Sequence, residues 1–164
     1  MNFANFPPGT QLITYDPSVP GKGGQPVEVF ALNVALYWAP LGSTEAQLVQ
    51  IGTIGSIAPI PGIFSAGTRT TGCATPGRVN ALFQVRAWSA GFLSYEAAIA
   101  SGDPTKFAGK SKVFENATDD PNKPPPTLPA ALTGFTSFGV VPIPEPSTIL
   151  LGILGAGVLL LRRR

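Results

Sequence analysis

Four carboxylates in the second half of this 164-residue sequence could together bind a metal ion: Asp103, Glu115, Asp119 and Asp120. Carboxylate oxygens are the ligands that calcium prefers in proteins. These residues do not follow the spacing of an EF-hand loop, and isolated loop carboxylates are usually solvated. The sequence therefore predicts no metal site.

The tripeptide Gly109-Lys110-Ser111 has the residue types that end a phosphate-binding loop. The full pattern needs a glycine five residues before Gly109, where Pro104 stands, and an apolar strand that runs into the loop. We therefore interpret this tripeptide as the start of a strand after a tight turn and not as a nucleotide site.

The sequence contains no histidine and a single cysteine, Cys73. Histidine is the usual general base, and its absence excludes a cysteine–histidine nucleophile. A hydrolase would have to use a pair of carboxylates, and no pair here has a supporting motif. We therefore predict no catalytic residue, no cofactor and no enzyme activity.

Aromatic rings could stack on sugars, because their faces pack against apolar surfaces. The candidates are Trp38, Trp88 and Tyr95. In a small β domain most such rings belong to the core, so both interpretations stay open. A flat threonine array, which ice binding would favour, is limited to Thr68 and Thr70.

The charge distribution argues against nucleic-acid binding. Residues 1–143 carry eight basic and eight acidic side chains, and the net charge of +2 comes from three C-terminal arginines against Glu145. The body is therefore neutral and has no basic surface for phosphates.

The composition favours short strands joined by turns, because 19 residues are glycine, 18 are proline and only 12% are charged. We predict an all-β fold, specifically a small antiparallel β-sandwich of the jelly-roll or Ig-like type. The expected elements are strands at 27–39, 47–54, 62–71, 78–88, 111–118 and 132–140, and a short helix at 94–101.

Alternation is clearest in the segment 78–88, where apolar residues on one face oppose polar residues on the other. This period of two predicts a half-buried antiparallel strand. In 27–39, Val34, Leu36 and Trp38 likewise share a face opposite Ala35 and Tyr37. For 78–88, the apolar set is Val79, Ala81, Phe83, Val85 and Ala87, and the polar set is Arg78, Asn80, Gln84 and Arg86.

The C-terminus combines Pro144-Glu145-Pro146, an uncharged apolar run over 147–161 and a basic end. Fifteen helical residues rise roughly 22 Å, against a bilayer core of about 30 Å, so the run is short for a permanent anchor. The alternative is an apolar helix packed in the core of a soluble domain, but three arginines at its end do not suit such a helix. The residues expected to anchor and orient the segment are Leu150, Leu151, Leu154, Leu159, Leu160, Arg162, Arg163 and Arg164.

The ordered set "VPIPEPSTILLGILGAGVLLLRRR" (141–164) resembles the PEP-CTERM sorting signal of bacterial exported proteins. The resemblance implies processing at or near Pro144-Glu145-Pro146 by an exosortase, a membrane-embedded transpeptidase-like enzyme. It also implies export in a Gram-negative bacterium, often one that makes extracellular polysaccharide. The same tail is also described as an ice-binding protein C-terminal domain, a name that is not evidence of ice binding.

The resemblance and the positive-inside rule together predict a location. Before processing, the chain is a single-pass inner-membrane protein with its body outside and its C-terminus cytoplasmic. After processing, it is at the cell surface or extracellular. The expected partners are an exosortase, the membrane and extracellular polysaccharide, and no nucleic acid.

The body also resembles a group of uncharacterised PEP-CTERM proteins, through "FQVRAWSAGFLSYEAAIASG" (83–102), "GKSKVF" (109–114) and "PPPTLPAALTGFTSFGV" (124–140). In that group a strand like "NFANF" (2–6) follows soon after a signal peptide. This resemblance implies that a leader has been lost or that the start is assigned too late.

The expected organisation has four parts. They are a β-sandwich body at 1–118, a proline-rich spacer at 119–130, the last body strand at 131–140 and the sorting signal at 141–164, with its transmembrane helix at about 147–161. The leading functional hypothesis is a non-enzymatic surface or matrix protein. The alternative is a carbohydrate-binding module displayed by the same tail, which a glycan array would distinguish.

Overall fold

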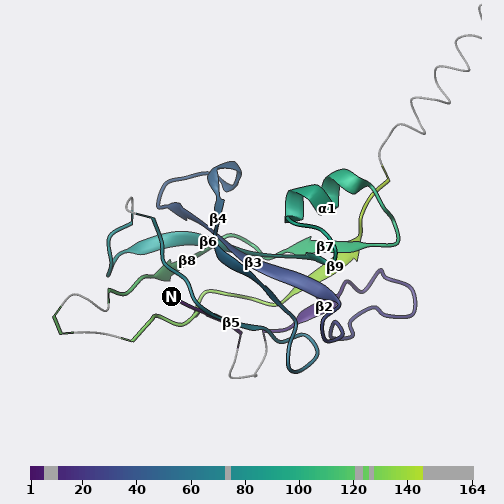
Figure 1. Cartoon of the computed structure of the whole chain (residues 1–164), viewed down its shortest axis with the longest axis horizontal. Coiled ribbons are helices and arrows are strands. Elements are labelled where there is room, and N and C mark those ends of the chain that lie inside the picture. The colour runs from purple at the N-terminus through teal and green to yellow at the C-terminus, as the bar shows by residue number, and fades with distance from the viewer. Residues whose placement is uncertain (6–10, 73–74, 121–123, 126–127, 146–164) are drawn as a thin grey trace, which may run out of the picture.

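The computed structural model describes residues 1–5, 11–72, 75–120, 124–125 and 128–145, which form a mainly β structure with one short α-helix (Figure 1). The expectation of a β fold is therefore confirmed. In chain order the elements are β1 (Asn2–Ala4), β2 (Ile13–Tyr15), β3 (Leu32–Pro40), the 3-10 helix η1 (Glu45–Gln47), β4 (Val49–Ser56), β5 (Ser65–Thr68), β6 (Asn80–Ser89), α1 (Tyr95–Ser101), β7 (Phe107–Lys110), β8 (Phe114–Ala117) and β9 (Phe138–Pro142).

Seven of the strands form one sheet, in the order β2-β9-β7-β6-β3-β4, with β8 also paired to β6. β1 and β5 form a separate two-stranded ribbon. The expected antiparallel sandwich is wrong in two respects. β2 and β9 are parallel, so the sheet is mixed, and the second layer is only this ribbon with its adjoining loops.

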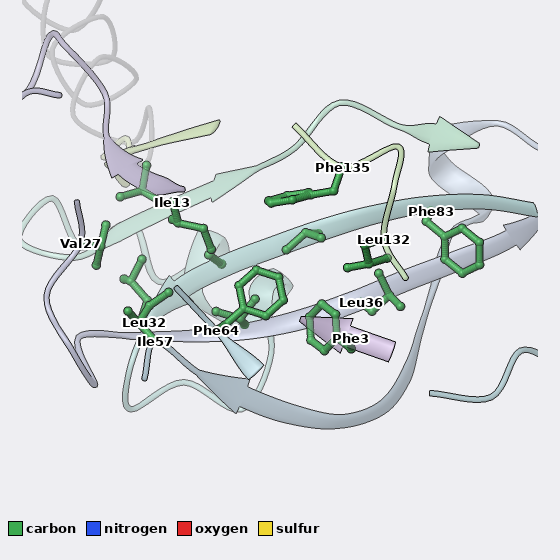
Figure 2. Packing of buried hydrophobic residues seen from close by; sticks show 14 of the residues in the cluster. Phe3, Ile13, Val27, Leu32, Leu36, Ile57, Phe64, Phe83, Leu132 and Phe135 are labelled. Atoms are coloured by element: carbon green, nitrogen blue, oxygen red, sulfur yellow. The ribbon is translucent and has the colours of Figure 1, made fainter. Parts of the chain in front are cut away.

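One face of the sheet carries the larger core. Val34, Leu36 and Trp38 of β3 lie on this face, as the alternation predicted, and Leu32 joins them. Figure 2 shows Phe3, Phe64 and Phe135 packed across the central strands beside Leu36 and Phe83. The β6 residues on this face are Ala81, Phe83, Val85 and Ala87, all with no exposed surface.

The opposite face of the sheet is also covered, so the prediction that β6 is half-buried is wrong. Helix α1 contacts β6 and β7 on this face, and Trp88 of β6 is fully buried there with Tyr37 and Ala98. Gln84, expected on a solvent-facing side, is 1% exposed. Val79 lies before the strand begins and is 43% exposed, although its position in the pattern placed it in the core.

Helix α1 forms where the sequence predicted it, because its ends carry strong capping residues. The Ser94 hydroxyl accepts a hydrogen bond from the Ala97 N–H (3.0 Å), which satisfies a free donor of the first turn. Gly102 takes a left-handed conformation (φ 60°) and ends the helix, as glycine readily does.

The Gly109-Lys110-Ser111 tripeptide ends β7 and begins a bulge, so its interpretation as a strand start is wrong. Residues 111–113 lie opposite Gln84 and Val85, between the pairs Arg86↔Lys110 and Phe83↔Phe114, which leaves one extra residue on this side. Ser111 keeps Val85 paired: its N–H donates to the Val85 carbonyl (2.9 Å), and its hydroxyl accepts from the Val85 N–H (3.0 Å).

Position 109 requires glycine because the chain there passes very close to β9. A Cβ atom at this position would lie 2.6 Å from the Gly139 carbonyl oxygen and 3.0 Å from the Val140 Cα. Backbone atoms cannot move aside as a flexible side chain can, so Gly109→Ala is expected to destabilise the body by about 1–3 kcal/mol. Urea unfolding measures this loss. The exposed Lys112→Ala is the control, and equal losses for both variants would contradict the prediction.

The last strand begins later than expected. Residues 131–137 form no strand, and β9 starts at Phe138. Asn116 of β8 holds the preceding segment: its Nδ2 donates to the Ala131 carbonyl (2.9 Å), and its Oδ1 accepts from the Thr133 N–H (2.8 Å) and the Gly134 N–H (3.1 Å). This asparagine, 4% exposed, takes the place of strand pairing for 131–134.

Candidate sorting site

The end of β9 positions the sorting signal. β9 is antiparallel to β7 on one side and parallel to β2 on the other, with Val140 fully buried. The chain stays attached one residue past the strand, because the Ile143 N–H donates to the Lys106 carbonyl (2.8 Å). Ile143 is 1% exposed and packs in the core on the α1 face.

Pro144 and Glu145 are both exposed and follow Ile143 directly. The boundary between the folded body and the exposed part of the signal is therefore sharp. In Figure 1 the yellow end of the described chain rises from β9 on the side of the sheet that carries α1, in agreement with the packing of Ile143 beside Ala98. The two described residues of the tripeptide are thus accessible and directly follow the sheet.

The remaining predicted residues of the signal lie outside the described residues. They are Pro146, the apolar segment 147–161 with its leucines, and Arg162 to Arg164. Cys73 also lies outside them. Within residues 1–145, in the part the structure describes, no helix is both long enough and apolar enough to span a membrane.

Comparison with known families identifies the C-terminal segment. The chain ends in a protein-sorting signal, since a family model for such signals matches residues 142–164. That model describes the PEP-CTERM protein-sorting motif, so the chain contains a PEP-CTERM sorting domain at its C-terminal end, which supports an exported protein targeted to an exosortase. No curated protein and no solved structure matches the chain.

The carboxylates considered for metal binding are not gathered together. Asp103 accepts hydrogen bonds from the Thr105 N–H (2.9 Å) and hydroxyl (2.7 Å), a local turn that also lowers the pKa of its carboxyl. Asp119 and Asp120 line a pocket of about 360 Å³ beside Thr118, and both have partners. The described residues contain no group of three side chains suited to hold a metal ion.

The aromatic residues proposed for sugar stacking lie on different sides of the sheet. Trp38 is buried in the larger core, where its Nε1–H donates to the Thr75 hydroxyl (3.2 Å). Trp88 is fully buried on the α1 face, and Tyr95 meets it edge-on with ring centroids 6.5 Å apart. The three rings therefore share no exposed surface.

A polar network beneath α1 was not predicted from the sequence. Arg86 forms an ion pair with Glu96 (2.8 Å), lies 3.9 Å from the centre of the Tyr37 ring and donates to Gln84 Oε1 (2.8 Å). The Tyr37 hydroxyl donates to Glu96 (3.1 Å), and burial, reinforced by that carboxylate, raises the pKa of Tyr37 to about 12. The tyrosine thus stays a neutral donor at neutral pH, and the network fastens α1 to the sheet.

Gln84 also connects this network to η1. Its Nε2 donates to Glu45 (3.0 Å) and to the Ser111 carbonyl (3.0 Å). The sequence signal that could have revealed this role is a polar residue between Phe83 and Val85 in the middle of a long strand. A buried side-chain amide must satisfy its donors and acceptor.

Proposed function

We propose that this protein is a non-enzymatic surface or matrix protein that an exosortase processes through its C-terminal signal. The observation that carries the proposal is the PEP-CTERM match at 142–164, joined to a body that holds the chain as far as the backbone hydrogen bond of Ile143. The body faces outward before processing and is released to the cell surface afterwards. Display of a sugar-binding module is not favoured, because the rings of Trp38 and Trp88 are buried on opposite faces.

The tail acts as a transient membrane stop in this proposal. Its apolar run over 147–161 is shorter than the roughly 20 residues that usually span a bilayer, which suits a segment that only pauses there. Each arginine would cost about 2.5–3.5 kcal/mol at the bilayer centre, so Arg162 to Arg164 oppose passage of the tail and hold the C-terminus in the cytoplasm. Pro146 suits the first turn of the expected helix.

Replacement of Glu145 by alanine is expected to leave the exported protein uncleaved and membrane-bound, because it removes the single charge of the motif. The test uses the full chain, fused to an export signal, in a host that processes another PEP-CTERM protein. The readout is the intact mass of the exported protein. Glu115→Ala, which removes an exposed carboxylate from β8, is the matched control and should be processed like wild type.

Replacement of Arg162, Arg163 and Arg164 by serine is expected to reduce both membrane retention and processing in the same assay. Recovery of wild-type protein with Leu161 and the arginines still attached, while the second PEP-CTERM protein is cleaved, would overturn the proposed processing. It would leave a plain C-terminal anchor.

A further inference from the structure

The three residues that precede the exposed part of the signal, 141–143, form a distinct unit at the end of β9 that we name the terminal segment. The parallel pairing with β2 ends at Val140, whose carbonyl accepts from the Asp16 N–H (3.0 Å). The terminal segment pairs on its other edge with β7, through Ala108↔Val141 and Phe107↔Pro142. Its detachment would break both of these β7 pairs, while residues 138–140 stay paired with β2.

Ile143 supplies most of the burial that holds the terminal segment in place. Its side chain is 1% exposed in the cluster that contains Trp88 and Ala108, whereas Val141 is 40% exposed. Its N–H also bonds the chain to the residue that precedes β7, at the Lys106 carbonyl. Segments held by few such contacts open locally at a lower free energy than the rest of the sheet.

An enzyme that acts on a peptide bond near Glu145 must bind the chain directly beside the folded body. Two extended residues reach only about 7 Å, so Pro144 and Glu145 place the reacting bonds next to the end of β9. Peptide-processing sites bind their substrate as an extended strand through backbone hydrogen bonds and side-chain pockets. The backbone donors of 141–143 that face β7 are not free for such binding while the segment is paired.

We propose that the terminal segment must detach from β7 before the exosortase can engage the signal, and that Ile143 is the positioning residue that controls this step. The inference rests on the proposed processing. The rate of cleavage then depends on how often the terminal segment is detached, because the enzyme binds only the detached form. Ile143 itself takes no part in the chemistry.

Three variants of the full chain test the inference in the host described above, with the initial rate of tail loss as the readout. Ile143→Ala should raise that rate at least about tenfold, since loss of a buried isoleucine side chain costs more than the 1.4 kcal/mol that equals a factor of about ten. Val141→Ala, at the exposed position of the same segment, is the matched control and should stay within about twofold of wild type. A Gly-Ser-Gly-Ser insertion between Ile143 and Pro144 should also raise the rate about tenfold, because it frees the signal without disturbing the core.

Hydrogen exchange gives a second readout that a general loss of stability would not reproduce. The Ile143 amide should exchange faster than the Val85 amide of β6 in wild type, and Ile143→Ala should speed exchange in 141–143 while leaving β6 protected. If Ile143→Ala unfolds the whole body, the rate of tail loss in the insertion variant tests the proposal in its place.

The outcomes separate the two proposals. If wild type is processed and neither Ile143→Ala nor the insertion raises the rate of tail loss, the proposed role of the terminal segment is overturned. The proposed processing by an exosortase would then still stand. Absence of processing in wild type and all variants, while another PEP-CTERM protein is cleaved, would overturn the proposed processing and this inference with it.

Discussion

Phe83→Asp is expected to unfold the body of this protein. Phe83 has no exposed surface in the larger core, and its ring centroid lies 6.2 Å from that of Phe114. Loss of a buried phenylalanine costs about 3–5 kcal/mol, and an unpaired buried carboxylate adds several more. The sum is comparable to the whole stability of a typical domain, about 5–15 kcal/mol.

The matched control for this substitution is Val79→Asp. Val79 belongs to the same apolar set in the sequence pattern, but it lies just before β6 begins and is 43% exposed. The control should keep the native circular dichroism spectrum and elute as a compact species in gel filtration. Both proteins are best prepared as residues 1–145, because a fragment that ends at 140 would remove the buried Ile143. A folded Phe83→Asp protein would refute the assignment of this face to the core.

Asn116→Ala is expected to lower the free energy of unfolding by about 3 kcal/mol, because it removes five part-buried hydrogen bonds. The Asn116 side chain donates to Ala117 and Ala131 and accepts from the Thr133 backbone, the Thr133 hydroxyl and the Gly134 backbone. The effect should concentrate in the segment that leads to β9, where hydrogen exchange will be fastest.

Asn80→Ala provides the control, since Asn80 is an exposed asparagine on the neighbouring strand β6. It should change stability by less than about 0.5 kcal/mol. Urea unfolding of both variants measures the difference. A loss at position 116 no larger than that at position 80 would show that segment 131–134 does not depend on this side chain.

Local patterns predicted the central strands well. The alternation in 27–39 and 78–88 assigns the residues of β3 and β6 that enter the larger core correctly, apart from Val79, because it depends only on the period of two that any strand imposes. It did not show that the opposite face is also covered. Helix α1 lies within the predicted range 94–101, and its capping residues Ser94 and Gly102 are adjacent to it in the sequence. The ordered signal at the C-terminus was equally readable, since its three parts are consecutive.

Features that depend on distant residues were not predictable in this way. β2 and β7 have only three and four residues, too few to show a period, and their strand conformation comes from pairing with β9. The roles of Gln84 and Asn116 follow from partners on other elements, such as Glu45 and Thr133. A polar residue in a strand pattern is assigned to solvent by default, and only the fold shows that its hydrogen bonds are satisfied inside.

The position of β9 between β2 and β7 has a consequence for the timing of folding. β2 lies near the start of the chain and β9 near its end, so the sheet can close only after almost the whole body has been synthesised. Contacts between such distant segments form slowly, because the loop between them must first be ordered. The pairing of β2 with β9 is therefore completed last, after the strands between them have been synthesised.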